Sequence, residues 1–175
     1  MTAARLQSLG GQLVRPEICA FSVYIDDGPI NSFNAANTNT TIPYSTNGTV
    51  LFDRNGDYDL ANNKFTAPVS GLYQLNLKLR VEDVTSGNYI VSFLREPGYT
   101  GNGGANNQHA SRNTADLIYS QTYNIRNATA YNTLESNALL YLASGQEVEH
   151  SMHVENDTAI RLADRGCMFN GYFVG

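Results

Sequence analysis

Residues 50–79 decide the fold of this chain, and they read VLFDRNGDYDLANNKFTAPVSGLYQLNLKL. We interpret the stretch as a strand, a polar turn, an anchored loop and a second, longer strand. In its last part apolar and polar residues alternate, and a strand places alternate side chains on opposite faces. The pattern therefore predicts an apolar face of Tyr73, Leu75, Leu77 and Leu79 and a polar face of Gln74, Asn76, Lys78 and Arg80.

Two residues mark the boundary between the loop and the long strand. Pro68 has a fixed φ and no backbone N–H, so we expect it in the loop and not in a hydrogen-bonded ladder. Gly71 can adopt a positive φ, so we expect a tight turn there that starts the strand.

Length and composition favour a single all-β domain. The chain has 175 residues, 15 glycines and 11 tyrosines, and the Asn, Gly, Thr and Tyr it is rich in suit turns and pleated surfaces. A net charge of −5 disfavours a nucleic-acid partner, which requires a basic surface. No apolar run approaches the ~18 residues of a membrane span, so membrane insertion is not expected.

Further strands are expected along the whole chain, and no long helix is. A polar connection with short edge pairings is expected at 31–43, and Asn- and Gly-rich turns separate the other strands. This succession indicates a sandwich or jelly roll. The predicted strands are 18–25, 50–52, 72–80, 89–94, 115–125, 131–142, 147–154 and 167–174.

Residues 1–16 form an N-terminal arm that precedes the domain at 17–175. Leu6, Leu9 and Leu13 follow a helical spacing that two glycines interrupt. An isolated segment of this kind makes too few contacts to offset the conformational entropy that it loses on ordering. We therefore expect the arm to dock on another surface.

Residues 96–114 form a long loop with no apolar periodicity. Loops of more than about 12–15 residues inside a compact domain are commonly functional. Its Tyr99, Asn106 and His109 have the side chains of contact surfaces, and a protein or a glycan is a candidate partner.

Asp53, Asn55 and Asp57 place oxygen ligands at alternate positions, as in the first half of a calcium-binding EF-hand loop. The glycine and the bidentate glutamate of that loop would fall at Tyr58 and Lys64, however. A calcium site and a plain Asx-rich turn both remain open, and no other cofactor is indicated.

The other residues that could act in catalysis form no recognisable catalytic site, so we expect that the protein is not an enzyme. His150 and His153 are three residues apart in a predicted strand, which places them on opposite faces, so we expect two separate, exposed histidines. No nucleophile elbow is present, and no base is paired with a nucleophile, so no catalytic residue is predicted. Cys19 and Cys167 lie near opposite ends of the chain and are expected to be reduced thiols.

The spacing of Tyr58, Phe65, Gly71 and Tyr73 resembles the signature of the complement C1q-like globular domain, a relative of the tumour necrosis factor-like jelly rolls. Three further segments, in the expected order, resemble the opening strand, a later strand start and the closing strand of that family. They are AFSV at 20–23, GQEV at 145–148 and FNGYF at 169–173.

This resemblance implies an all-β, ten-strand jelly-roll sandwich that assembles as a homotrimer and binds partners. It also implies that Tyr24, Tyr141 and Tyr172 lie in the core or at the trimer seam. The first and last strands would be antiparallel neighbours, with Cys19 beside the end of the last strand and Cys167 beside the end of the first. The two thiols would then be too far apart for a disulfide.

A short arm attached to a trimeric jelly roll, without a collagen-like Gly-X-Y stalk or an apolar leader, is similar to bacteriophage virion proteins. We therefore expect a structural virion protein, a fibre, knob or capsid decoration, that is made in the host cytosol and docks on other virion proteins through its arm. Two alternatives are a tip that binds a host receptor or glycan, and a bacterial surface or spore-coat adhesin.

Overall fold

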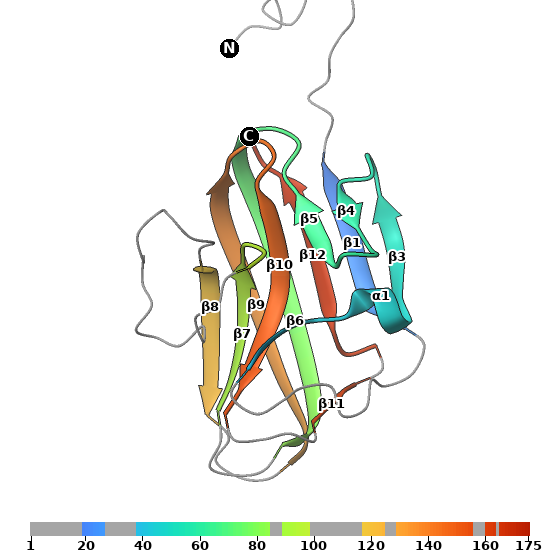
Figure 1. Ribbon diagram of the computed structural model, residues 1–175, viewed down its shortest axis with the longest axis vertical. Helices are drawn as coiled ribbons and strands as arrows, with labels where there is room; N and C mark the ends of the chain where they lie inside the picture. The colour runs from blue at the N-terminus through green and yellow to red at the C-terminus, as the bar shows by residue number, and fades with distance from the viewer. Residues whose placement is uncertain are drawn as a thin grey trace, which may run out of the picture.

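The computed structural model describes residues 19–26, 38–84, 89–98, 117–124, 129–155, 160–163 and 165–175. These residues form twelve strands and one short helix, arranged as two antiparallel sheets packed face to face (Figure 1). The proposed arm residues Leu6, Leu9 and Leu13 and the loop residues Tyr99, Asn106 and His109 lie outside the described part of the chain.

Sheet A is built around the long strand that the sequence indicated. β6 (Gly71–Val84) pairs with β9 (Thr129–Leu142), with β12 (Met168–Phe173) and with the short β11 (Arg161–Leu162). β12 pairs with β1 (Ala20–Ile25), and β1 pairs with β3 (Gly48–Asp53). The first and last strands are thus antiparallel neighbours, as expected.

Sheet B has β10 (Glu147–Val154) near its centre. On one side lie β7 (Tyr89–Arg95) and β8 (Leu117–Asn124), and on the other β5 (Lys64–Thr66) and β4 (Tyr58–Asp59). β2 (Asn39–Thr41) also pairs with β10, which confirms the short edge pairing expected in the polar connection. The one-turn helix α1 (Tyr44–Asn47) leads from β2 into β3.

The core between the sheets is aromatic at the end that holds the signature residues. Phe21 of β1 stacks on Tyr58 and Phe65 with ring centroids 5.3 and 4.7 Å apart, and it meets the edge of Phe169 at 4.9 Å. The hydroxyl of Tyr73 donates a hydrogen bond of 2.6 Å to the carbonyl of Val69, which fixes the loop that contains Pro68. The alternation of β6 is confirmed, because its odd-numbered residues from 71 to 81 are buried and its even-numbered ones are not.

The expected reason for Gly71 is wrong, because its φ is not positive. A Cβ at this position would lie 2.5 Å from Cε2 of Phe173 and 2.8 Å from the carbonyl oxygen of Gly175. Gly71 is required by space: the C-terminal segment lies directly over it, and the amide of Leu72 donates to the Gly175 carbonyl. The loop expected before it is also partly ordered as strand, since Phe65 pairs with Val148 of β10.

The two cysteines are free and buried, as predicted. The carbonyl of Cys19 accepts a hydrogen bond from the amide of Phe173, and the carbonyl of Cys167 accepts one from the amide of Ile25. The thiols therefore lie toward opposite ends of the β1–β12 pair. Burial raises the pKa of Cys167 to about 12, so this thiol is protonated at neutral pH.

The prediction of two exposed histidines is wrong, although they do point to opposite faces of β10. His150 is fully buried in the core, and its Nδ1 and Nε2 lie 2.8 Å from the Tyr44 hydroxyl and 3.0 Å from the Ser92 hydroxyl. His153 is 3% exposed, stacks on Tyr89 and has Asn39 3.2 Å from its Nδ1. The spacing correctly predicted that the two histidines lie on opposite faces of the strand. It did not show that both faces of β10 are buried at these positions.

Candidate oligomer interface

The outer face of sheet A exposes large apolar side chains. They lie at the end of the sheet near the C-terminus, which is marked in Figure 1. Leu139 and Tyr141 of β9 are 58% and 68% exposed, and Tyr172 of β12 is 47% exposed. Leu72 and Val174 are exposed beside them. Contiguous apolar surface of this kind marks interaction sites in soluble proteins. We call these five residues the apolar patch.

Strand register brings the apolar patch together from distant parts of the sequence. Leu72 of β6 is paired with Tyr141, and Gln74 is paired with Leu139 on one side and with Tyr172 on the other. The amide of Val174 donates to the carbonyl of Leu72. All five side chains project from the same face because paired residues in a sheet point the same way.

Farther along the strands the same face becomes polar. Asn76 is paired with Asn137 and with Asn170, so that three asparagines lie at one level on three neighbouring strands. At the next level Lys78 forms an ion pair of 3.1 Å with Glu135. The face therefore changes from apolar to amide-bearing to charged along the direction of β6.

The edge of sheet A adds a second exposed apolar pair. Phe52 of β3 is paired with Ser22 at the level of the asparagines, and Leu51 lies beside it where the β1–β3 register shifts between Ser22 and Val23. Both side chains are exposed. The shift is a bulge, a device that blunts a sheet edge against uncontrolled strand pairing.

The structure places the three tyrosines expected in the core or at the trimer seam on this one face. Tyr141 and Tyr172 belong to the apolar patch, and Tyr24 is half-buried at the level of Lys78, paired with Met168. Sequence reasoning did not single out Leu72, Leu139 or Val174. A signal was present for Leu72, which interrupts the otherwise polar face of β6.

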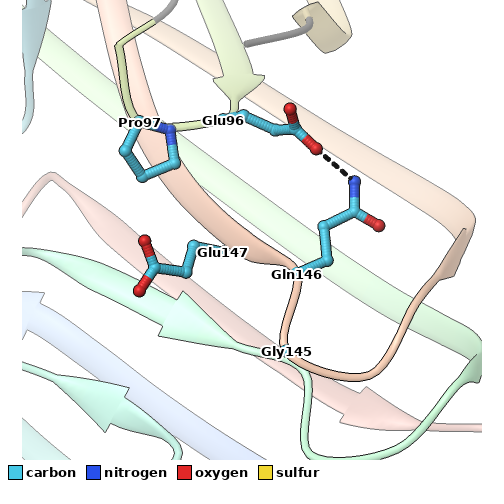
Figure 2. A pocket seen from close by; sticks show the side chains of 5 residues that line it. All are labelled: Glu96, Pro97, Gly145, Gln146 and Glu147. Atoms are coloured by element: carbon cyan, nitrogen blue, oxygen red, sulfur yellow. Dashed lines mark hydrogen bonds between the residues drawn. The ribbon is translucent and has the colours of Figure 1, made fainter. Parts of the chain in front are cut away.

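A small hollow lies where β7 ends and β10 begins (Figure 2). It has a volume of about 300 Å³ and is lined by Glu96, Pro97, Gly145, Gln146 and Glu147. The side-chain amide of Gln146 donates to Glu96 at 2.7 Å, and its oxygen accepts from the backbone amide of Ala143 at 3.0 Å. The opposite wall is Glu147, which is held by Lys64 at 2.6 Å. The hollow is thus a polar, acceptor-rich depression at the end of β7, where the segment 96–114 begins.

The turn considered for calcium is held by its own backbone contacts. The carboxylate of Asp53 accepts hydrogen bonds of 2.9 to 3.0 Å from the amides of Gly56, Asp57 and Tyr58. These are the contacts of an Asx turn, the alternative that the sequence left open. Within the described residues, no three His, Cys, Asp or Glu side chains converge on a common point where they could hold a metal ion.

The part of the chain that the structure describes also contains no helix with the length and apolar character needed to cross a membrane.

No protein-family model and no curated sequence matches this chain. Solved structures do match: the tumour necrosis factor Eiger from S. frugiperda has a TM-score of 0.61 at 10% identity, over 91% of this chain and 94% of that one. Murine APRIL at pH 8.0 has a TM-score of 0.60 at 13% identity, over 90% and 99%. The chain has the C1q/TNF-like jelly-roll fold. The globular domain of zebrafish complement 1qA agrees, with a TM-score of 0.56 at 16% identity over 90% and 98%.

The fold expected from the signature residues is therefore confirmed. At these identities the likeness establishes the fold and nothing further about function, because one fold hosts many functions.

Proposed function

We propose that this protein is a non-enzymatic structural module that assembles as a homotrimer through the outer face of sheet A and takes part in a bacteriophage virion. The apolar patch is the observation that supports this proposal most directly. It lies on one face of sheet A, it is formed by three neighbouring strands, and beside it the same face becomes polar.

Burial of the apolar patch supplies a driving force for association. Complete burial of a large apolar side chain contributes about 1.5–3 kcal/mol. The five side chains of the patch are about half exposed, so each has roughly 1 kcal/mol still to gain from a neighbouring subunit. In a cyclic assembly this burial free energy is gained at every subunit contact. A ring of three subunits requires two different, complementary surfaces on each subunit. We assign these two surfaces to the apolar patch, on β9, β6 and β12, and to Leu51 and Phe52 of the edge strand β3, which lie toward opposite edges of sheet A.

We expect Leu139→Lys to convert the trimer into a folded monomer. The substitution places a charge within the apolar patch, where burial against a neighbour would cost more free energy than the contact contributes. Native mass spectrometry or light scattering of the recombinant protein measures the result. Val69→Lys is the matched control, because Val69 is also exposed and apolar but lies in the loop that leads to β6. A trimer that persists in the Leu139→Lys variant would assign the interface to another surface.

The virion role rests on the N-terminal arm. The chain enters the domain at Cys19, whose carbonyl accepts a hydrogen bond from Phe173, so the arm joins the domain at the end that bears the apolar patch and the C-terminus. An arm attached there can extend away from the sandwich toward a docking surface. At about 3.3 Å per residue, sixteen extended residues reach roughly 50 Å.

Deletion of residues 1–16 is expected to leave a folded trimer that no longer joins particles. Incorporation is measured by mass spectrometry of purified particles assembled with either the full chain or the shortened one. Incorporation of the shortened chain at the full level would show that the arm is not the docking element.

The alternative role, a tip that binds a host receptor or glycan, is supported by the hollow at Glu96 and Glu147, because it opens where the loop at 96–114 begins. Replacement of that loop by a short Gly/Ser linker, in particles that carry the normal arm, separates the two roles. Normal incorporation with lost adsorption would assign recognition to the loop, and normal adsorption would exclude it.

A further inference from the structure

We propose that a hydrogen-bonded row of three amides, Gln74, Asn76 and Asn170, sets the register in which copies of this chain meet and so restricts the assembly to one oligomer. This inference rests on the proposed self-association through sheet A and identifies the residues that make it specific. We call these three residues the amide row.

The amide row is a directional chain across β6 and β12. Nε2 of Gln74 donates to Oδ1 of Asn76 at 3.2 Å, and Nδ2 of Asn76 donates to Oδ1 of Asn170 at 2.7 Å. Asn76 is therefore engaged through both ends of its amide, which fixes its orientation. The row ends in an acceptor, Oε1 of Gln74, and in a donor, Nδ2 of Asn170.

The ends of the amide row face the surface that a second copy would cover. All three side chains are half-buried on the outer face of sheet A, between the apolar patch and the Lys78–Glu135 ion pair. Burial of a side-chain amide without a hydrogen-bond partner costs free energy, whereas burial against another amide costs little because the two can form a hydrogen bond. The two ends of the amide row differ, so the donor Nδ2 of Asn170 in one copy can meet the acceptor Oε1 of Gln74 in the next. Such a contact is head-to-tail.

Displacement along the strands breaks this match. A slip by two residues, about 6.8 Å, moves the amide row of one copy opposite either the apolar patch or the ion pair of the other. In both cases polar groups are buried without suitable partners. A single buried asparagine restricts register and oligomer number in coiled coils by the same mechanism, at some cost in stability. Asn137, exposed on β9 beside Asn76, adds one more amide at this level.

The test is the double variant Asn76→Leu with Asn170→Leu. It removes the amides and enlarges the apolar patch, so association is expected to continue while its uniqueness is lost. Native mass spectrometry should show the fraction of protein outside the trimer peak rising at least about tenfold, as dimers and larger species. Asn55→Leu, in the exposed turn after β3, is the control for added surface apolarity and should leave the distribution unchanged. Circular dichroism confirms that each variant is folded.

Two outcomes would overturn the role of the amide row. A double variant that forms only trimers shows that register is set elsewhere, and a folded, monomeric double variant shows that the amides supply affinity instead of specificity. A wild-type protein that is monomeric would remove the proposed self-association itself, and it is recognised in the same measurement before any variant is compared.

Discussion

Replacement of Phe21 by alanine is expected to lower the free energy of unfolding by about 3–5 kcal/mol, which is a large part of the stability of an ordinary domain. Phe21 is 1% exposed and lies where the two sheets meet. Its ring contacts Tyr58 and Phe65 of sheet B and Phe169 of sheet A, so its removal leaves a cavity that three other rings line. Aromatic rings cannot collapse into such a space without leaving their preferred rotamers.

Chemical denaturation, followed by circular dichroism at a fixed protein concentration, measures this effect. Phe52→Ala is the matched control, because Phe52 is half exposed on the edge strand β3 and its removal creates no cavity. We expect its unfolding free energy to change by less than about 1 kcal/mol in a protein held below the concentration at which it associates. An equal loss in both variants would mean that the signature aromatics do not form the centre of the core.

The sequence predicted the fold well through one local rule and one family resemblance. The alternation from Tyr73 to Leu79 determines which face of β6 is buried, and that follows from strand geometry alone. The spacing of Tyr58, Phe65 and Tyr73 resembles a family signature, and all three rings take part in the aromatic cluster of the sandwich. The same resemblance implied that the first and last strands are antiparallel neighbours with the two thiols apart, and the structure shows that pairing.

The features that sequence reasoning missed depend on contacts between distant segments. Gly71 is constrained by Phe173 and Gly175, which are about a hundred positions away in the chain, and no local rule reveals that contact. The apolar patch is formed only when β6, β9 and β12 are in register, and single residues such as Leu139 give no sign of it. The Asx-rich turn at Asp53 was one of two alternatives that the sequence left open, because the three backbone partners of its carboxylate are apparent only once the turn is folded.

The buried His150 predicts an acid-sensitive fold. Burial lowers its pKa from about 6.5 to about 3, since the imidazolium would have to sit in the core between Tyr44 and Ser92. In the unfolded chain this histidine binds a proton near pH 6.5, whereas in the folded chain it stays neutral. Its contribution to stability is therefore complete above pH 6.5 and is lost progressively as the pH falls toward 3.

Each pH unit in that window corresponds to about 1.4 kcal/mol, so lowering the pH from 6.5 to 5 should remove about 2 kcal/mol through His150. Denaturation curves recorded between pH 8 and pH 5, above the range in which most carboxylates titrate, isolate the effect. His150→Gln keeps hydrogen-bonding groups near the two hydroxyls and does not titrate, so it should be less stable at pH 8 but depend on pH much less than the wild type, with the remaining slope due to groups such as His153. His153→Gln should flatten the profile less, because the lowering of the His153 pKa by burial is opposed by the charge of Glu155. A His150→Gln variant with the same pH slope as the wild type would mean that the imidazole can be charged within the fold, by rearrangement of Tyr44 and Ser92 or by entry of water into the core.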